Sequence, residues 1–332
     1  MNNKYQRLLQ EIETERQEQE NLHRDSKVLI VDGMNLFIRT FSAIPTLNED
    51  GVHVGGLSGF LKSLGATIRM VNPTRVVVVF DGKGGSQRRK EIYSNYKEGR
   101  AIKSRLNRVV GFEDIDDEQS SMKYQLFRVF SYLQNLPLTI ISIDKIEADD
   151  VIASYSRQEK GPTRIITGDR DLFQLVDDKR DVRVVYLAKG ISNHDLVDLK
   201  WIANKYGIPG DRYGLFAMIR GDASDGLPGI RGIGEKGAAA IATTFSSMDS
   251  VISAAHEEDD HLHPTHRKKI LADLSYAQIA ERLVLCASDL KLPKVDLSIP
   301  KQPANPDYLQ SLKGDYGLGA SVDRLFAALG WS

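Results

Sequence analysis

The chain has 332 residues, 41% of them hydrophobic, enough for one large or two closely packed domains with a sizeable core. Its single cysteine, Cys286, excludes an internal disulfide and a zinc site built from several thiolates. No apolar run is long enough to span a bilayer, and the charged N-terminus does not resemble a secretory signal. We therefore expect a cytoplasmic protein that makes no contact with membranes.

The net charge of −1 hides an uneven distribution of charged residues. Between Lys83 and Arg108, nine basic and two acidic residues give a net charge of +7, so the rest of the chain is acidic. Such separation suits a protein that holds a polyanion beside a metal site. On charge alone, a solvated basic helix is the simpler interpretation.

In chain order, residues 1–25 come first; they are rich in Glu, Gln and Arg and predict a charged helical or disordered extension. Five apolar runs then predict buried strands, at residues 27–32, 75–81, 138–143, 164–169 and 182–187. Helical patterns lie between them, for example over 56–71 and 121–134. This alternation predicts an α/β fold with a mainly parallel central sheet covered by helices.

The chain is expected to divide into three further parts after the extension. The α/β core should span residues 26–198, and a helical region should follow over 199–292. Within the latter, a glycine-rich stretch at 226–234 precedes an alanine-rich helix. The proline-containing residues 293–332 predict an irregular C-terminal strap.

Acidic residues gather where the predicted strands end and where the following loops begin. The carboxyl ends of parallel strands meet at one edge of a sheet, where ligands bind. The candidate site comprises nine acids: Asp32, Asp81, Glu147, Asp149, Asp150, Asp169, Asp171, Asp222 and Asp225. Any single one could be a helix cap or turn residue, but capping explains the whole set poorly.

Such a set of acids suits the hydrolysis of phosphodiesters. Two divalent ions about 3.5–4 Å apart can activate water and stabilise the leaving oxygen. Mg²⁺ prefers oxygen ligands, and an empty group of carboxylates would repel itself strongly. An EF-hand loop, a zinc-binding HxxxH pair and a GxSxG nucleophile elbow are all missing from the sequence.

Five short motifs resemble those of the structure-specific 5′ nucleases. This family includes flap endonucleases, the 5′-to-3′ exonuclease domain of bacterial DNA polymerase I, and stand-alone bacteriophage RNase H and 5′ exonucleases. The motifs lie at residues 31–35, 79–82, 146–150, 167–171 and 221–229. The resemblance covers about residues 28–290, and it implies a PIN-like fold with a helical arch at about 83–122 and a helix-hairpin-helix at about 226–241. It also implies a monomer in a bacterial or phage-infected cell.

The resemblance implies two bound Mg²⁺ ions, for which Mn²⁺ can substitute. The first site would be formed by Asp32, Asp81, Glu147 and Asp149. The second would be formed or completed by Asp169, Asp171 and Asp222. Asp150 and Asp225 would act in the outer shell, through water.

The resemblance also implies roles for the basic stretch. Arg89, Lys97 and Arg100 would hold the scissile phosphate and the threaded 5′ strand, and Lys97 and Arg100 would neutralise the transition state. Lys83 would contact the substrate, and Tyr96 would offer a face on which a base can stack. The acidic run at residues 113–118 departs from the basic character expected of an arch; it could repel or gate a DNA tail, or form a mobile loop.

In the helix-hairpin-helix, Gly232 and Gly234 would let the backbone approach a duplex phosphate, reinforced by Lys236 and a K⁺ ion on backbone carbonyls. The contact would be independent of sequence. The expected substrates are DNA with a 5′ flap or nick and RNA–DNA hybrids, cut to leave 5′-phosphates during replication and repair. Single-stranded-DNA-binding or clamp proteins are the expected protein partners.

Three other functions remain compatible with parts of the pattern. A PIN-like ribonuclease shares the strand-end acids but not the hairpin and the basic arch. A non-catalytic binder of branched DNA predicts lost acids, and none of the matched positions has lost its acid. A phosphatase acting on small molecules leaves the basic stretch and the hairpin unexplained.

Overall fold

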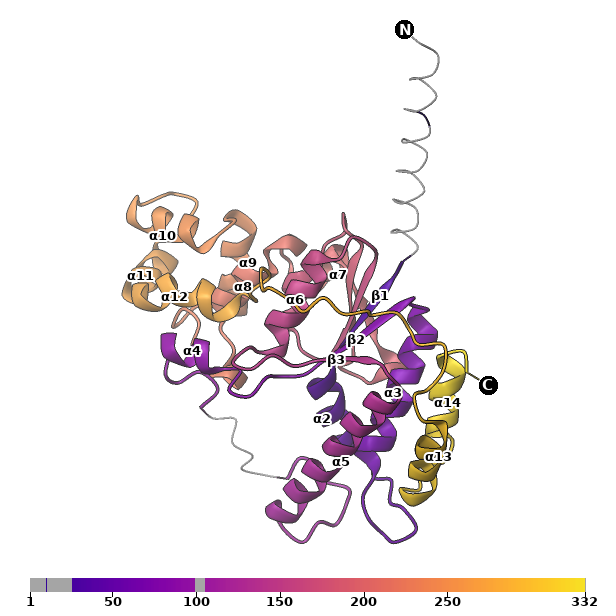
Figure 1. The fold of residues 1–332 in the computed structure, drawn as a ribbon. Coiled ribbons are helices and arrows are strands. Elements are labelled where there is room, and N and C mark those ends of the chain that lie inside the picture. The colour runs from indigo at the N-terminus through magenta and orange to yellow at the C-terminus, as the bar shows by residue number, and fades with distance from the viewer. Residues whose placement is uncertain (1–9, 11–25, 99–104, 332) are drawn as a thin grey trace.

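The computed structural model describes residue 10 and residues 26–98 and 105–331 (Figure 1). The predicted N-terminal extension, apart from Gln10, therefore lies outside the described residues, as does Arg100 of the predicted arch. Within the described parts of the chain, no helix is both long and apolar enough to cross a membrane.

A six-stranded sheet lies at the centre of the fold, in the order β3-β2-β1-β4-β5-β6. The strands are β1 (Val28–Asp32), β2 (Arg75–Val79), β3 (Thr139–Ile141), β4 (Thr163–Thr167), β5 (Val182–Tyr186) and β6 (Asp195–Val197). The first five are parallel, which confirms the prediction, and β6 runs antiparallel to β5. The sequence analysis missed β6, because three residues are too few to show a period.

Alternate residues of the strands serve two separate hydrophobic cores. Leu29 and Val31 of β1 belong to one core, and Val28 and Ile30 belong to the other. Helices α2 (Gly33–Ala43), α3 (Gly55–Val71) and α5 (Ile115–Asn135) cover the first face, and α6 (Ala148–Gln158) covers the second (Figure 1). Burial on both faces explains why the strands are continuous apolar runs.

The helical region after the sheet packs onto the core that contains α6. Its members are α7 (Leu199–Tyr206), α8 (Tyr213–Arg220), α9 (Glu235–Thr244), α10 (Met248–His256), α11 (Pro264–Ala272) and α12 (Leu274–Val284). The short helix α4 (Gln87–Ile92), from the predicted arch, contacts α12. Turns at residues 94–97 follow α4, and the chain is described again from residue 105.

The prediction of an irregular strap is wrong for the end of the chain. Around residue 298 the chain runs beside the start of β2, where Val76 N donates to Leu297 O at 2.8 Å. It then forms α13 (Pro306–Asp315) and α14 (Ala320–Ala328), which join the core that contains α3. Buried leucines and valines three residues apart drive these helices, and Pro306 is no obstacle because it occupies the first helical turn.

The acidic run 113–118 is the N-terminus of α5, so the interpretation as a mobile loop is wrong. Asp114 caps the helix by accepting a hydrogen bond from Asp117 N at 2.8 Å. Glu118 is buried and accepts from the backbone of Leu106 and Asn107 at 3.0 and 2.7 Å. Acids are favoured at a helix N-terminus, which explains their presence in an otherwise basic region.

Candidate active site

Three predicted carboxylates lie together where adjacent strands end. Asp32 ends β1, and its neighbours β2 and β4 are followed two residues later by Asp81 and Asp169. Asp32 accepts a hydrogen bond from Thr167 Oγ1 at 2.8 Å. Asp81 accepts one from Ala148 N, at the start of α6, at 2.9 Å. The parallel sheet therefore brings together acids that are far apart in the sequence.

The carboxylates at this edge disturb one another electrostatically. Burial raises the pKa of Asp32 to about 7, and the charges of Asp169 and Asp81 add to this shift. Burial also raises the pKa of Asp149 well above its usual range, with contributions from Asp169 and Asp32. Proximity of like charges in a poorly solvated site accounts for both shifts. Asp32, Asp81 and Asp149 form the first part of the candidate site, and Asp169 joins it to the second.

A second part of the site extends from Asp169 towards the loop after α8. Burial raises the pKa of Asp171 to about 7, and the charges of Asp169, Asp222 and Asp225 raise it further. Within the described residues, no three acidic, histidine or cysteine side chains already stand together as metal ligands. The donors are nevertheless all carboxylate oxygens whose ionisation a divalent cation would restore, so the set fits a hard metal such as Mg²⁺.

The guanidinium of Arg89 is a buried clamp behind these acids. Its nitrogens pair with both oxygens of Asp150, at 2.7 and 3.0 Å, and with Glu147. They also donate to the backbone carbonyls of Leu283 at 2.9 Å and Leu285 at 3.4 Å. All five N–H groups are thereby engaged, and the side chain is 4% exposed. Arg89 therefore has no donor left for a scissile phosphate in this structure, and the predicted role is corrected to that of a positioning residue.

Tyr96 and Lys97 lie next to this clamp, at the base of the predicted arch. Tyr96 is 3% exposed, and its hydroxyl lies 3.2 Å from Glu147 and from Asp225. Its ring is flanked by the cations of Lys97 and Arg89, so no face is open for base stacking, contrary to the prediction. Lys97 pairs with Glu147 and lies 3.9 Å from Asp225. Burial alone would raise the pKa of Glu147, but Lys97 and Arg89 outweigh it and lower that pKa.

The loop after α8 carries Asp222 to the rim of the site. Asp222 accepts hydrogen bonds from Ser224 N and Oγ at 2.7 and 2.6 Å. Burial would raise its pKa, but these bonds and the charge of Arg220 lower it. Gly226 has a φ of +71°, and a Cβ there would lie 2.6 Å from Asn95 O. Only glycine therefore lets this loop contact the base of the arch region so closely.

A glycine-rich hairpin joins α8 to α9, as the predicted helix-hairpin-helix requires. Buried Ile233 anchors it, while Gly232, Gly234 and Lys236 are exposed on its surface. Gly232 has a φ of +79°, and its carbonyl accepts a hydrogen bond from Lys269 Nζ at 2.6 Å. An ammonium group thus already occupies a carbonyl where K⁺ was expected. Lys83 is also exposed, just beyond Asp81.

Three residues of the site were not singled out by the sequence analysis. Thr167 donates to Asp32 and accepts from Asp169 N at 2.9 Å, so it links two strand ends. Asn35 accepts from Gly168 N at 2.7 Å, and Arg39 donates to Gly168 O at 3.2 Å. Thr167 and Asn35 lie within motifs already quoted, which was the one signal available. Their partners become apparent only once β1 and β4 are paired.

Comparison with known proteins identifies the family. Residues 27–207 match the family described as "5′-3′ exonuclease, N-terminal resolvase-like domain", and residues 208–306 match "5′-3′ exonuclease, C-terminal SAM fold". A 5′-3′ exonuclease of Streptomyces coelicolor is 33% identical over 303 residues, covering 91% of this chain and 99% of that protein. One of Mycobacterium tuberculosis is 32% identical, covering 92% of this chain and 98% of that protein. The thermostable DNA polymerase I of Thermus aquaticus is 32% identical over 83% of this chain, but only 30% of the polymerase is covered.

Solved structures show the same fold at low sequence identity. The D15 protein of bacteriophage T5, co-crystallised with metal ions, has a TM-score of 0.61 and 18% identity, covering 91% of this chain and 99% of that one. Human GEN1 in complex with Holliday junction DNA has a TM-score of 0.57 and 16% identity, covering 93% and 72%. The chain shares a mostly parallel sheet covered by helices with these structures, and exonuclease relatives match it over nearly their whole length. It therefore belongs to the 5′-3′ exonuclease family and is a nuclease.

Proposed function

We propose that this protein is a structure-specific 5′ nuclease that requires a divalent metal ion. It hydrolyses phosphodiester bonds near the 5′ end of DNA flaps, nicked duplexes or RNA–DNA hybrids and leaves 5′-phosphates. The observation that carries the proposal is the gathering of Asp32, Asp81, Asp149 and Asp169 at one sheet edge, where burial and repulsion raise the pKa of Asp32 to about 7. A cation is the simplest means of keeping such acids ionised.

Two divalent ions, Mg²⁺ or in its place Mn²⁺, fit the two parts of the site. Asp32, Asp81, Glu147 and Asp149 would hold the first, and Asp169, Asp171 and Asp222 the second, with Asp150 and Asp225 behind them. Bound there, the ions would supply an activated water and a partner for the leaving oxygen. Support comes from T5 relatives of the same fold, which were crystallised with metal ions, including zinc, and with DNA.

The protein's own residues would orient the substrate around this site. Lys97 holds its ammonium group beside Glu147 and Asp225, where it would meet a phosphate bound to the carboxylates and offset its developing charge. Arg100 is proposed to act with it, from outside the described residues. Lys83 is exposed beside Asp81, where it can contact the same strand. The buried guanidinium of Arg89 would help to keep Glu147 ionised and in place.

The duplex is proposed to lie across the helix-hairpin-helix. The exposed backbone at Gly232 and Gly234 would approach one phosphate, and Lys236 would add a charge. A K⁺ ion at the hairpin carbonyls is part of the proposal, but it would compete with the ammonium of Lys269 for Gly232 O. Such contacts bind DNA of any sequence, which the proposed removal of flaps and primers in replication and repair requires.

Two alternatives are less well supported. A PIN-like ribonuclease would have no evident use for the helix-hairpin-helix, which is an element proposed to bind a duplex. A branched-DNA binder without activity would not need repelling carboxylates at the sheet edge.

Contacts with clamp or single-stranded-DNA-binding proteins would suit the proposed cellular role.

A substrate panel tests the proposal. Matched 5′-flap, nicked and blunt DNA duplexes and an RNA–DNA hybrid, each labelled at its 3′ end, would be incubated with Mg²⁺ or EDTA. We expect metal-dependent cuts near the 5′ end of the labelled strand, with a 5′-phosphate on the retained product. Binding of the flap without cleavage in Mg²⁺ or Mn²⁺ would favour the non-catalytic binder, and cleavage confined to single-stranded RNA would favour the ribonuclease.

A further inference from the structure

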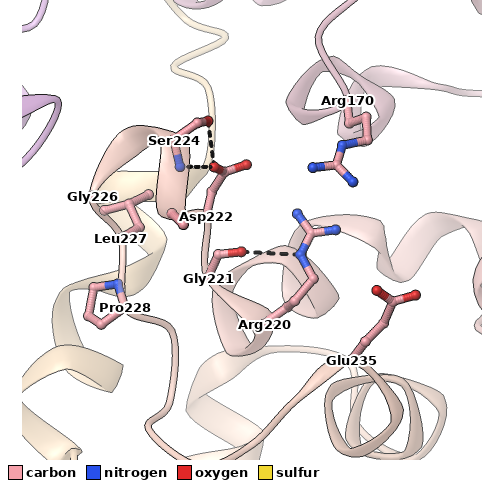
Figure 2. Close-up of a pocket in the computed structure, with 10 residues that line it drawn as sticks. Arg170, Arg220, Gly221, Asp222, Ser224, Gly226, Leu227, Pro228 and Glu235 are labelled. Carbon is pink, nitrogen blue, oxygen red and sulfur yellow. Dashed lines mark hydrogen bonds between the residues drawn. The ribbon is translucent and has the colours of Figure 1, made fainter. Parts of the chain in front are cut away.

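A cleft of about 720 Å³ lies beside the candidate active site, between the Asp222 loop and the start of α9 (Figure 2). Arg170, just after β4, and Arg220, at the end of α8, line it together with loop residues 221–228 and Glu235. The cleft therefore connects the rim of the carboxylate site to the helix-hairpin-helix. Neither arginine was given a contact with nucleic acid above.

The two guanidinium groups point towards the same space (Figure 2). Arg220 donates from Nε to Gly221 O at 3.1 Å, and its buried side interacts with the hydroxyl of Tyr213, whereas its Nη2 atom makes no hydrogen bond within the described residues. Across the described ranges, the side chain of Arg170 makes no hydrogen bond and no ion pair. Two cations thus face one cleft with unused donors, an arrangement that favours binding of an anion.

Asp222 interacts with these arginines through charge at longer range, but the acids that line the cleft do not pair with them directly. Asp222 and Glu235 form no ion pair within 4 Å of either guanidinium in the described parts of the chain. One oxygen of Asp222 is instead held by Ser224. The phenyl ring of buried Phe216 lies 5.1 Å from Arg220 Cζ, and together with the bond to Gly221 it fixes the direction of that guanidinium.

We propose that Arg170 and Arg220 form a subsite for a backbone phosphodiester of the duplex, on the strand that runs from the carboxylate site to the helix-hairpin-helix. Planar guanidinium groups suit a phosphate, which can accept several hydrogen bonds from them at once. The inference rests on the proposed function, and it adds a contact between the two places where that function already puts nucleic acid.

The position of the two arginines gives the subsite a mechanical consequence. Arg170 directly follows Asp169, and Arg220 lies two residues before Asp222. A phosphodiester held by the arginines would therefore lie next to Asp169 and Asp222, two of the three acids proposed to hold the second metal ion. The two residues position the duplex and make no contact with the reacting atoms, so their loss should weaken binding more than the rate of cleavage at saturation.

Salt-dependent binding tests the subsite. Affinity for a fluorescent 5′-flap duplex would be measured with Ca²⁺ at several NaCl concentrations for wild type, Arg170→Gln, Arg220→Gln and the double variant. We expect about a tenfold loss of affinity in the double variant, and a decrease of about 0.9 in the slope of log affinity against log salt, the value for one lost phosphate contact. The rate of a single turnover at saturating enzyme should change less than threefold in Arg170→Gln.

Arg212→Gln is the matched control, because Arg212 is a partly exposed arginine of the same helical region that lines a different cleft. It should leave both the affinity and the slope as in wild type. Thermal melting would report folding of every variant. Should Arg220→Gln fail to fold, Arg170→Gln decides the test, since Arg170 is exposed and its side chain makes no hydrogen bond or ion pair with the described residues.

The outcomes separate this inference from the proposed function. If wild type cuts the flap but the double variant binds with wild-type affinity and slope, the subsite is refuted and the proposed function stands. If wild type neither binds nor cuts any flap, the proposed function itself fails. Inorganic phosphate provides the last distinction. Suppose that phosphate stabilises wild type but not the double variant, while both proteins bind DNA with equal affinity. The cleft then binds free phosphate, and its assignment to the duplex is overturned.

Discussion

Arg89 and Asp150 form a bidentate ion pair in the interior, with nitrogen–oxygen distances of 2.7 and 3.0 Å and side chains that are 4% and 3% exposed. The pair ties α4, from the predicted arch, to α6, which carries the acids of the candidate site. The same guanidinium reaches Glu147 and the carbonyls of Leu283, in the last turn of α12, and Leu285, directly after it. The geometry of the carboxylates therefore depends on a cation whose donors are all engaged within the protein.

Removal of this cation should destabilise the fold. Arg89→Ala leaves Asp150 buried without its partner, so the free energy of unfolding should fall by about 3–5 kcal/mol in urea denaturation. Arg88→Ala is the control, because Arg88 pairs with the same carboxylate at 3.2 Å but its side chain is 44% exposed; it should cost less than about 1 kcal/mol. Wild-type stability in Arg89→Ala combined with weaker DNA binding would restore the phosphate-contacting role.

The hydroxyl of Tyr96, and not its ring face, should be the important group of that side chain. Tyr96→Phe keeps the ring but removes hydrogen bonds to Glu147 and Asp225, so stability in urea should fall by about 1–2 kcal/mol. The control is Tyr93→Phe, at a partly buried tyrosine three residues earlier, which should be near neutral. Unchanged stability in Tyr96→Phe, with a loss of flap affinity only in Tyr96→Ala, would instead support base stacking.

The carboxylates should make the stability of the metal-free protein depend on pH. The pKa of Asp32 rises from 3.8 to about 7 on folding, and that of Asp171 also reaches about 7. A raised folded-state pKa means that stability is greatest below pH 3.8 for these groups and is lost as pH rises towards 7 and above. In EDTA the melting temperature should therefore be several degrees lower at about pH 8 than at about pH 6.5.

Two comparisons check that prediction. Mg²⁺ should raise the melting temperature more at the higher pH, because it binds the ionised carboxylates. Asp32→Asn should flatten the dependence on pH, since an amide does not titrate. A melting temperature in EDTA that rises over this pH interval would show that the acids do not repel one another as the structure indicates.

The hairpin offers a test of the proposed K⁺ ion. Lys269→Met removes the ammonium group that lies 2.6 Å from Gly232 O and leaves that carbonyl open to another cation. Duplex affinity in KCl should then exceed that in NaCl of equal ionic strength by a larger factor in the variant than in wild type. Lys268→Met, an exposed neighbour on the same helix, is the control. Equal factors in all three proteins would argue against a K⁺ ion at this carbonyl.

The strand ends could be predicted from sequence because one rule governs them. Apolar runs that end in Asp32 and Asp169 place those acids at a common edge once the strands are parallel. By contrast, the sequence shows that Arg89 is charged but not where its side chain points. Arg88 and Arg89 are adjacent on α4, yet the first is exposed and the second is buried. Tertiary packing, which places the carbonyls at the end of α12 beside α4, decides between them.

Features that depend on distant partners escaped prediction for the same reason. Arg170 and Arg220 are 50 positions apart and lie outside the basic stretch, so nothing in the sequence joins them at one cleft. The helical C-terminus was missed because its prolines were given more weight than the spacing of Leu309 and Leu312 or of Val322 and Leu325. A proline in the first turn is compatible with a helix, so it should not have outweighed this spacing.

The central claim is that the strand-end carboxylates bind the metal ions that cut the substrate. The most direct test is single-turnover cleavage of a 5′-flap duplex in Mg²⁺ by wild type and Asp169→Asn, with flap binding measured in parallel. We predict that the variant binds within about threefold of wild type but cuts at least about a thousandfold more slowly, as expected when a group acts only in the transition state. Cleavage by Asp169→Asn at the wild-type rate would contradict the account.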